Sequence, residues 1–126
     1  MRRPSSSQDR PVTAAPAKIR FAYSSNAFLR RPFAEVPAAI RRIGYEGLEV
    51  LMDRPHVWPT EERAVAGARR AIAAAGLAIS NVNINTAMGL DGGICRDGPG
   101  PSLSDGDPER VAARVRYTEA GLRAAR

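Results

Sequence analysis

The chain has 126 residues, of which 44% are hydrophobic and 25% charged, and its formal net charge is +6. This composition is typical of one globular domain, and no apolar run approaches the roughly 18 residues that a membrane-spanning helix needs. The single cysteine, Cys95, excludes an internal disulfide and a cysteine-built zinc site, and the basic start lacks the apolar segment of a secretory signal. We therefore expect a cytoplasmic protein with no membrane partner.

The excess positive charge is concentrated at the N terminus. Residues 1–18 contain four basic residues and one acidic residue, so the other 108 residues share only half of the net charge. Residues 1–17 also contain almost no large apolar side chain, which predicts a disordered basic arm. Elsewhere the arginines lie beside glutamates on predicted helix faces, and such solvated faces differ from the clustered basic stripe of nucleic-acid-binding proteins. We therefore do not expect a nucleic-acid partner.

A strand and a helix are predicted first. Large apolar residues alternate with small or polar ones over residues 19–24, which predicts a β-strand. An apolar stripe at helical spacing follows, made of Phe33, Val36, Ile40 and Ile43. The helix should begin between Pro32 and Val36, because Pro37 is tolerated only in a first turn. Gly44 should end it by adopting a left-handed conformation.

The next two strands are predicted to enclose a second helix. Residues 48–52 and 77–84 have the apolar content of buried strands. Thr60 is a candidate N-cap, and Gly76 is expected to stop the helix after Ala75. The inner face of this helix is predicted to consist of Val65, Ala68, Ile72 and Ala75.

A long loop and a third helix complete the chain. Residues 86–106 are rich in Gly and Pro, and unstructured loops of this length are often functional. Asp107 as N-cap followed by Pro108 gives a strong start signal for the last helix. Its apolar stripe is predicted to be Val111, Val115 and Leu122.

The repeated strand–helix alternation predicts an α/β fold with a parallel sheet. Parallel neighbours need a crossover helix, and consecutive strands usually lie side by side with right-handed crossovers. The strands should therefore be adjacent in the order one, two, three. Long loops at one end of the strands, and no Gly-rich phosphate turn after the first, favour a partial barrel over a dinucleotide-binding sheet.

Several segments resemble one family of barrel enzymes. They are the run 33–50 with its Gly44-Tyr45-Glu46-Gly47 turn, residues 84–88, residues 101–103, and residues 107–118. In this order they resemble the sugar phosphate isomerase/epimerase family, whose fold is a xylose isomerase-like (β/α)8 TIM barrel. The resemblance covers residues 18–126, and a whole barrel needs about 250 residues. It therefore implies the truncated N-terminal portion of such a barrel, with about three βα units.

The resemblance implies metal-assisted proton transfer next to a carbonyl in the full-length barrel. The family's divalent metal (Mn, Co, Mg or Zn) is held by two Glu, one Asp and one His from later strands, which this chain lacks. We therefore expect no catalytic residue and no metal ligand here. The fragment would supply walls of the site for a sugar or sugar phosphate. Two alternatives stay open: a metal-dependent apurinic-site endonuclease-like DNA repair protein of the same superfamily, and a non-catalytic barrel remnant.

Candidate substrate-binding residues come from the strand ends, because barrel active sites lie there. In the third strand the side chains of Asn81, Asn83 and Asn85 should share one face, opposite Val82 and Ile84. Amide side chains both donate and accept hydrogen bonds, so Asn83 and Asn85 are candidates to bind sugar hydroxyls. The alternative is that these amides satisfy buried backbone groups or one another.

The second strand contributes two carboxylates on the corresponding face. Glu49 is expected to be structural, with Arg20 as its partner, because a buried charge needs one. Asp53 follows the strand and either contacts substrate or caps the loop.

The first two loops add Asn26 and His56 to the candidate substrate-binding residues. His56 can hydrogen-bond a sugar or shuttle a proton, but solvent exposure without a role is an equal alternative. Trp58 either forms a wall for a sugar ring or pins its loop. Finally, three parallel strands leave open edges, so self-association through them is a further expectation.

Overall fold

The computed structural model describes residues 19–85, 90 and 101–126. The predicted basic arm at 1–17, most of the loop at 86–106 and Cys95 lie outside the described residues. The strands are β1 (Ala22–Ser24), β2 (Gly47–Leu51) and β3 (Ala78–Asn83). The helices are η1 (Ser25–Phe28), η2 (Phe33–Glu35), α1 (Val36–Ile43), α2 (Glu62–Ala75) and α3 (Pro108–Ala124), of which η1 and η2 are 3-10 helices.

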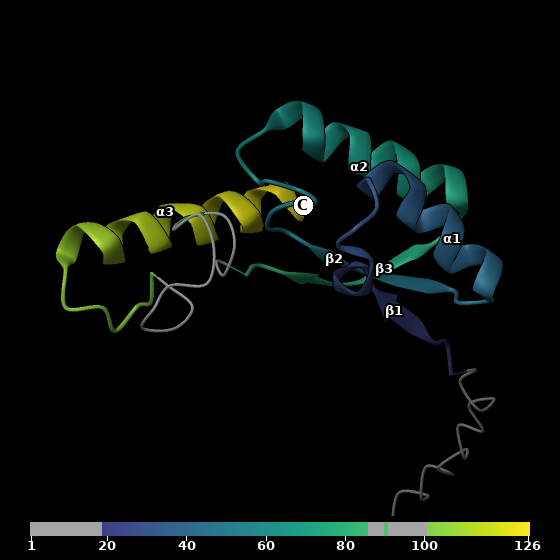
Figure 1. The fold of residues 1–126 in the computed structure, drawn as a ribbon, viewed down its shortest axis with the longest axis horizontal. Helices are drawn as coiled ribbons and strands as arrows, with labels where there is room; N and C mark the ends of the chain where they lie inside the picture. Colours follow the sequence, from purple (N-terminus) through teal and green to yellow (C-terminus); the bar gives the residue numbers. More distant parts are fainter. Residues whose placement is uncertain (1–18, 86–89, 91–100) are drawn as a thin grey trace, which may run out of the picture.

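The three strands form one parallel sheet in the order β1-β2-β3, which confirms the predicted order (Figure 1). Ser24 lies opposite Glu49, and Val50 lies opposite Val82. A register shift between Leu48 and Glu49 inserts one extra residue on the β3 side of the ladder. Since the strands are parallel, their carboxyl ends lie at the same end of the sheet. The mixed α/β class and the three adjacent parallel strands are therefore as predicted.

Helices α1 and α2 cover the same face of the sheet (Figure 1). Beneath them lies a core of buried apolar side chains that includes Val36, Ile40, Leu48, Val50, Met52 and Ile72. Val82 packs against this core from β3. The period-two prediction for β2 and β3 is therefore confirmed, because alternate apolar residues face the helices and the residues between them face away.

Two glycines end the crossover helices, as predicted. Gly44 follows α1 with φ of 107° and Gly76 follows α2 with φ of 63°. Only glycine adopts such conformations without a steric penalty from a Cβ atom. Each glycine N–H also bonds the last carbonyls of its helix, so each residue both terminates a helix and turns the chain toward the next strand.

Three local predictions were wrong. The N-cap of α2 is Glu61 rather than Thr60, because a turn closed by the Glu61 amide and the Trp58 carbonyl delays the helix by one residue. The first strand spans three residues instead of the predicted six. Ile43 remains 62% exposed, because it is the last residue of α1 and lies beyond the core.

Helix α3 uses a different face from the predicted one. Asp107 caps its first turn as expected, accepting a hydrogen bond from the Glu109 amide at 2.9 Å. However, Val115 and Leu122 are exposed, and the buried residues are Tyr117, Ala120 and Gly121. A Cβ atom at Gly121 would lie 2.7 Å from Cδ1 of Ile84. Small residues therefore allow α3 to approach the end of β3, and this close approach decides which face is buried.

We predict opposite effects of alanine at two glycines. Gly44→Ala should destabilise the fold by about 1–2 kcal/mol, because alanine is strained at positive φ. Gly67→Ala is the control within α2, where an added Cβ meets only the end of the Arg70 side chain at 3.9 Å. It should stabilise the fold by about 0.5–1 kcal/mol, because alanine favours helix. Urea denaturation measures both, and equal effects would contradict the assignment of Gly44.

Candidate functional site

A row of polar side chains crosses the sheet on the face opposite α1 and α2. The Ser24 hydroxyl donates to Oε1 of Glu49 at 2.6 Å, and the Asn81 amide donates to Oε2 at 2.8 Å. Each strand of the sheet thus contributes to this row. Among the described elements no α-helix covers this row, which we call the polar row, and Asn81 is exposed.

Hydrogen bonds keep Glu49 ionised. The Ser24 hydroxyl, followed by the Asn81 amide, lowers the pKa of Glu49 below its ordinary value; burial opposes them, and the Asn83 amide adds the smallest lowering effect. All these groups donate to the charged form, and that form is what such bonds stabilise. The polar row therefore presents a fixed negative charge on the sheet.

Arg20 is not the partner of Glu49, so that prediction was wrong. Arg20 precedes Ser24 by four residues and lies outside the β1–β2 ladder, which begins at Ala22. The register instead sets Ser24 directly opposite Glu49, close enough for a neutral hydroxyl to replace the expected salt bridge. The sequence analysis did not select Ser24, because this residue is the last of a short strand and was not matched with a residue of the neighbouring strand. The signal was available, since Ser24 and Glu49 occupy matching polar positions in neighbouring strands.

Asn83 and Asn85 lie where the sequence placed them, at the carboxyl end of β3. Asn83 shares the face of Glu49 and makes a small contribution to lowering the pKa of its carboxylate, while its own carbonyl accepts from the Met52 amide at 2.8 Å. Asn85 is half-buried beyond the strand. Nearby, Arg114 of α3 donates to the Ile84 carbonyl at 3.5 Å. Of the two candidates, Asn83 is therefore the one that joins the polar row.

Asp53 is buried at the end of β2, with only 1% of its surface exposed. Its carboxylate accepts a hydrogen bond from the Arg54 amide at 2.7 Å, and its carbonyl accepts from the His56 amide at 2.9 Å. Between the two alternatives for this residue, these contacts support the loop cap. The carboxylate is thus buried within its own loop.

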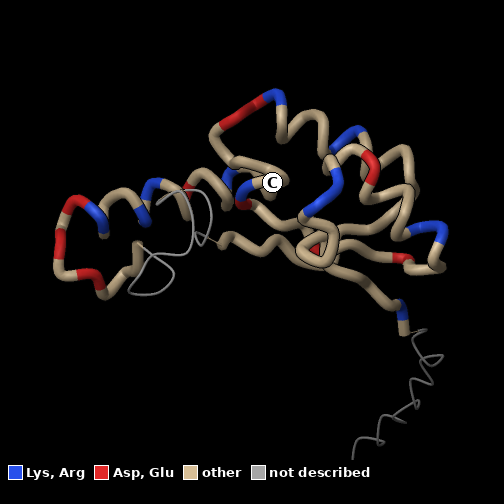
Figure 2. Tube along the Cα trace, in the orientation of Figure 1, with Lys and Arg blue, Asp and Glu red and all other residues tan. Residues whose placement is uncertain are grey.

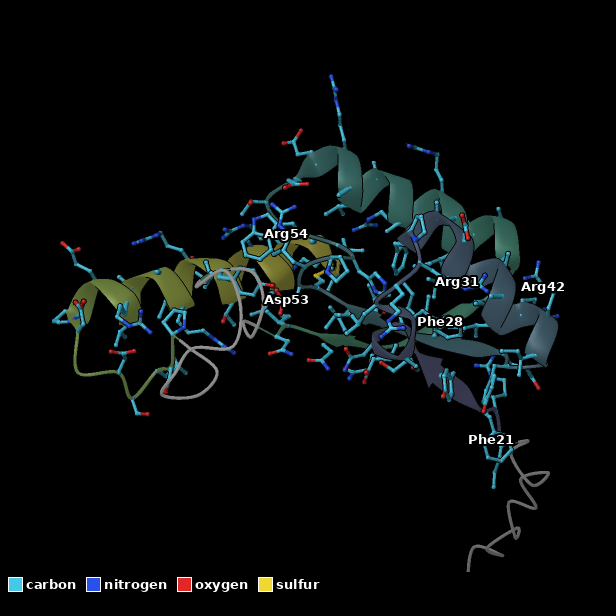
Figure 3. All side chains as sticks on the ribbon, in the orientation of Figure 1. Phe21, Phe28, Arg31, Arg42, Asp53 and Arg54 are labelled. Carbon is cyan, nitrogen blue, oxygen red and sulfur yellow. The ribbon has the colours of Figure 1, made fainter. Side chains whose placement is uncertain are left out.

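Tyr117 fixes α3 to the same strand end. Its hydroxyl donates to the Met52 carbonyl, and its ring packs on Trp58 with centroids 4.8 Å apart. The Arg54 guanidinium lies 5.0 Å from the Trp58 ring centroid and pairs with Glu61 at 2.6 Å. Figure 3 shows Asp53 and Arg54 at this junction between β2 and α3. Trp58 therefore pins the loop instead of presenting a wall to a ligand.

The surroundings of Tyr117 raise its pKa well above the ordinary value. Burial is the larger cause and the neighbouring Asp53 charge is the second, because both disfavour the phenolate. The hydroxyl therefore stays protonated at neutral pH and acts as a hydrogen-bond donor. Tyr117 acts as a structural anchor of α3.

His56 holds two loops together. Its Nε2 lies 3.2 Å from the Phe28 carbonyl of η1, and its ring packs edge-on against Phe33 at 5.5 Å. Its Nδ1 is buried without a hydrogen-bond partner among the described residues. Because a carbonyl only accepts, the neutral ring carries its proton on Nε2. His56 is therefore built into the packing and does not join the polar row.

Asn26 is exposed in η1, directly after β1. Its backbone amide donates to the Ser24 hydroxyl at 3.2 Å, so Ser24 accepts from η1 while it donates to Glu49. The neighbouring Ser25 hydroxyl is buried and accepts from the Leu51 amide at 2.8 Å. Asn26 thus borders the polar row through its backbone, and η1 is held over the end of the sheet.

Charges elsewhere are spread over the helices and loops. Figure 2 shows Lys and Arg interspersed with Asp and Glu along the chain, and pairs such as Arg31–Glu35 and Arg123–Glu119 lie one helical turn apart at 3.9 and 3.6 Å. Such exposed pairs contribute little to stability.

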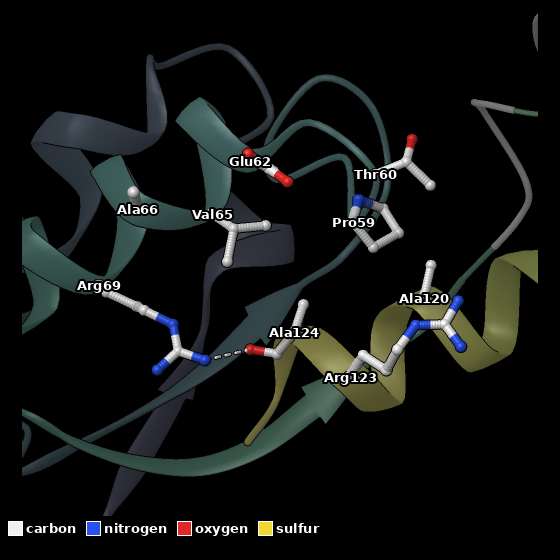
Figure 4. Close-up of a pocket in the computed structure, with 9 residues that line it drawn as sticks. All are labelled: Pro59, Thr60, Glu62, Val65, Ala66, Arg69, Ala120, Arg123 and Ala124. Atoms are coloured by element: carbon white, nitrogen blue, oxygen red, sulfur yellow. Dashed lines mark hydrogen bonds between the residues drawn. The ribbon is translucent and has the colours of Figure 1, made fainter.

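A hollow lies away from the polar row, between α2 and α3 (Figure 4). It has a volume of about 440 Å³ and an apolar floor formed by Val65, Ala120 and Ala124. Arg69 donates to the Ala124 carbonyl across it at 2.8 Å, which caps the end of α3. This groove is a helix–helix junction.

The metal ligands that the resemblance implies are not provided by the described residues. Within residues 19–85, 90 and 101–126, no group of three or more His, Cys, Asp or Glu side chains is arranged to hold a metal ion. The polar row has one carboxylate and two kinds of neutral partner, which do not fit that ligand set. The role proposed for these residues therefore depends on no metal that they would hold.

In the part of the chain that the structure describes, no helix is both long and apolar enough to cross a membrane. No family model matches the chain, and no curated protein is significantly similar to it.

We predict that Tyr117→Phe destabilises the fold by about 1–3 kcal/mol, because it leaves the buried Met52 carbonyl without its donor. The ring and its packing on Trp58 are retained, so the loss reports the hydrogen bond alone. Tyr23→Phe is the matched control, since Tyr23 is 40% exposed and should change stability by less than about 0.5 kcal/mol. Urea unfolding measures both variants. Equal losses would show that Tyr117 is not an anchor.

Glu49 should make folding stability depend on pH in the acid range. Its folded pKa lies below the ordinary value of 4.5, so its stabilising contribution is fully present above that value. The contribution is lost as the pH falls through the lower, folded pKa. Glu49→Gln should flatten this part of the stability profile, measured by urea unfolding between about pH 2.5 and 6. Glu62→Gln on exposed α2 is the control, and an unchanged slope in Glu49→Gln would refute the assignment.

Proposed function

We propose that the chain forms the N-terminal part of a TIM barrel of the sugar isomerase/epimerase type, and that its polar row lines the substrate side of the barrel. The observation that carries this proposal is the carboxylate–hydroxyl–amide row on the sheet face opposite the helices. Sugar-binding sites need a few convergent groups that exchange hydrogen bonds with hydroxyls, and this row supplies them.

The polarity of that face favours a barrel over a doubly wound sheet. A doubly wound sheet has helices on both faces, so its central strands are apolar on both. Here β2 is apolar toward α1 and α2, and on the other side it carries Glu49 together with the buried Leu51, while β3 carries Asn81 there. A barrel places helices outside only and keeps its site at the carboxyl ends of the strands. Ser24 is the last residue of β1, so the polar row begins at that end.

The catalytic step of such an enzyme would be proton transfer next to a carbonyl, which needs an acid and a base. Glu49 is unsuited to act as the acid, because its hydrogen bonds hold it in the ionised form. It is also unsuited to act as the base, because its lowered pKa makes it a weak proton acceptor. The described residues therefore bind and orient a ligand in this proposal. Turnover belongs to the family's carboxylates on later strands, so these 126 residues should be inactive alone.

The DNA-repair alternative is less well supported by the described residues. An endonuclease needs cationic side chains available to phosphates. Several arginines are instead engaged with acidic neighbours, such as Arg54 with Glu61 and Arg110 with Asp105, the latter at 2.8 Å. The polar row itself is negative, which opposes a phosphate backbone.

Titration of the ¹⁵N-labelled chain with D-glucose and D-fructose tests the proposal by NMR. We expect weak binding, with dissociation constants above about 1 mM, because an open sheet face offers few contacts. The amides that shift should be those of Ser24, Glu49, Asn81 and Asn83. Asn81→Ala should abolish these shifts, whereas Ser80→Ala, the exposed neighbour on β3, should keep them. Shifts confined to the groove between α2 and α3, or none, would refute the proposed site.

A further inference from the structure

In the polar row, Glu49 accepts every hydrogen bond and its neighbours donate them. Glu49 accepts at both carboxylate oxygens, from the Ser24 hydroxyl at 2.6 Å and from the Asn81 amide at 2.8 Å. The Asn83 amide lies near the same carboxylate and makes a small contribution to lowering its pKa. An ionised carboxylate can only accept, so every neighbour must turn a donor toward it.

This arrangement fixes which atoms of the asparagines remain for a ligand. When the NH₂ group of Asn81 faces Glu49, its carbonyl oxygen must point away from the carboxylate. Asn83 lies on the same face, with its backbone fixed by the bond between its carbonyl and the Met52 amide. Glu49 is therefore a positioning residue for the Asn81 amide. The face it organises offers acceptor atoms around one negative charge.

We propose that the polar row selects the donor-bearing part of a ligand, an ammonium or hydroxyl group, and rejects a phosphate or carboxylate group. The preferred ligand class is an amino-substituted sugar or polyol, with neutral sugars second. This inference rests on the proposed function and narrows it, because that function leaves sugars and sugar phosphates as equal candidates.

Nearby charges do not reverse this selectivity. The basic side chain at the end of β3 is Arg114, whose Nε donates to the Thr118 hydroxyl at 3.2 Å and whose NH2 group is directed to the Ile84 carbonyl. Arg54, at the end of β2, is held by Glu61 and the Trp58 ring. Both guanidiniums are thus oriented by other partners. A ligand anion at the polar row would meet the Glu49 carboxylate and amide oxygens.

Three probes test the proposal: D-glucose, and two derivatives that each differ from it in one substituent, D-glucosamine and D-glucose 6-phosphate. They are titrated into the full ¹⁵N-labelled chain at low ionic strength, and the amides of Glu49, Asn81 and Asn83 are followed by NMR. Glucosamine should bind about tenfold more tightly than glucose, because its ammonium forms charge-assisted hydrogen bonds. Glucose 6-phosphate should leave these amides unshifted.

Glu49→Gln separates charge from orientation. Its amide can donate to the Ser24 hydroxyl while its carbonyl still accepts from Asn81, so glucose should bind as before. The tenfold preference for glucosamine should disappear. Glu46→Gln removes the same charge at the opposite end of β2 and should keep the preference. The side-chain NH₂ signals of Asn81 provide a readout that needs no ligand, and they should shift in Glu49→Gln alone.

The outcomes distinguish this inference from the proposed function. Glucose binding at the polar row without a preference for glucosamine, or equal shifts with glucose 6-phosphate, would overturn the inference and leave the site intact. A preference that survives in Glu49→Gln would also overturn it. If none of the three probes shifts the sheet amides, the proposed site fails together with the inference.

Discussion

Strand β2 is the element on which the rest of the structure depends, because it is central in the sheet and both of its faces are packed, the side of Glu49 through Leu51, which is buried next to η1. Leu48, Val50 and Met52 pack beneath α1 and α2. Glu49, between them, faces the other way and bonds to both neighbouring strands. A slip of one residue would place the carboxylate in the apolar core and three large apolar side chains outside it. The alternation therefore fixes the register of the whole sheet.

The charge on β2 is tolerated because both neighbours supply donors. A carboxylate without partners on a half-buried face would be costly, and its protonation would be the usual escape. The Ser24 hydroxyl and the Asn81 amide instead make the ionised form the stable one. Fold and proposed function thus depend on the same bonds. The bonds that hold the charge in place also join β1 and β3 to β2.

The sequence was sufficient to predict this framework, because short-range physics determines it. Gly44 and Gly76 end their helices through backbone conformations that other residues avoid. Asp107 caps α3 through a bond to a residue only two positions away. The faces of β2 and β3 follow from the period of a strand.

Longer-range features were mispredicted for a common reason. The partner of Glu49 depends on the β1–β2 register, and strand pairing cannot be read from either strand alone. The face of α3 depends on how closely the helix approaches Ile84, which favours Gly121 over the larger Val115 and Leu122. The burial of Asp53 likewise depends on a distant element, because α3 packs against the end of β2. Tyr117, 65 residues from Met52, closes that region.

The carboxyl end of β2 and the outer edges of the described sheet differ in whether their polar groups have partners. At the carboxyl end of β2, the Tyr117 anchor, the buried Asp53 and the Trp58 ring satisfy one another. The outer edges of β1 and β3 carry backbone groups that no other described strand pairs. Exposed edge strands can pair with further strands, and a closed barrel removes such edges. Further strands would therefore satisfy both edges and enclose the polar row, whereas pairing between copies of this chain would satisfy only the edges. An enclosed row would have a lower dielectric around Glu49, which strengthens its discrimination between ligand charges.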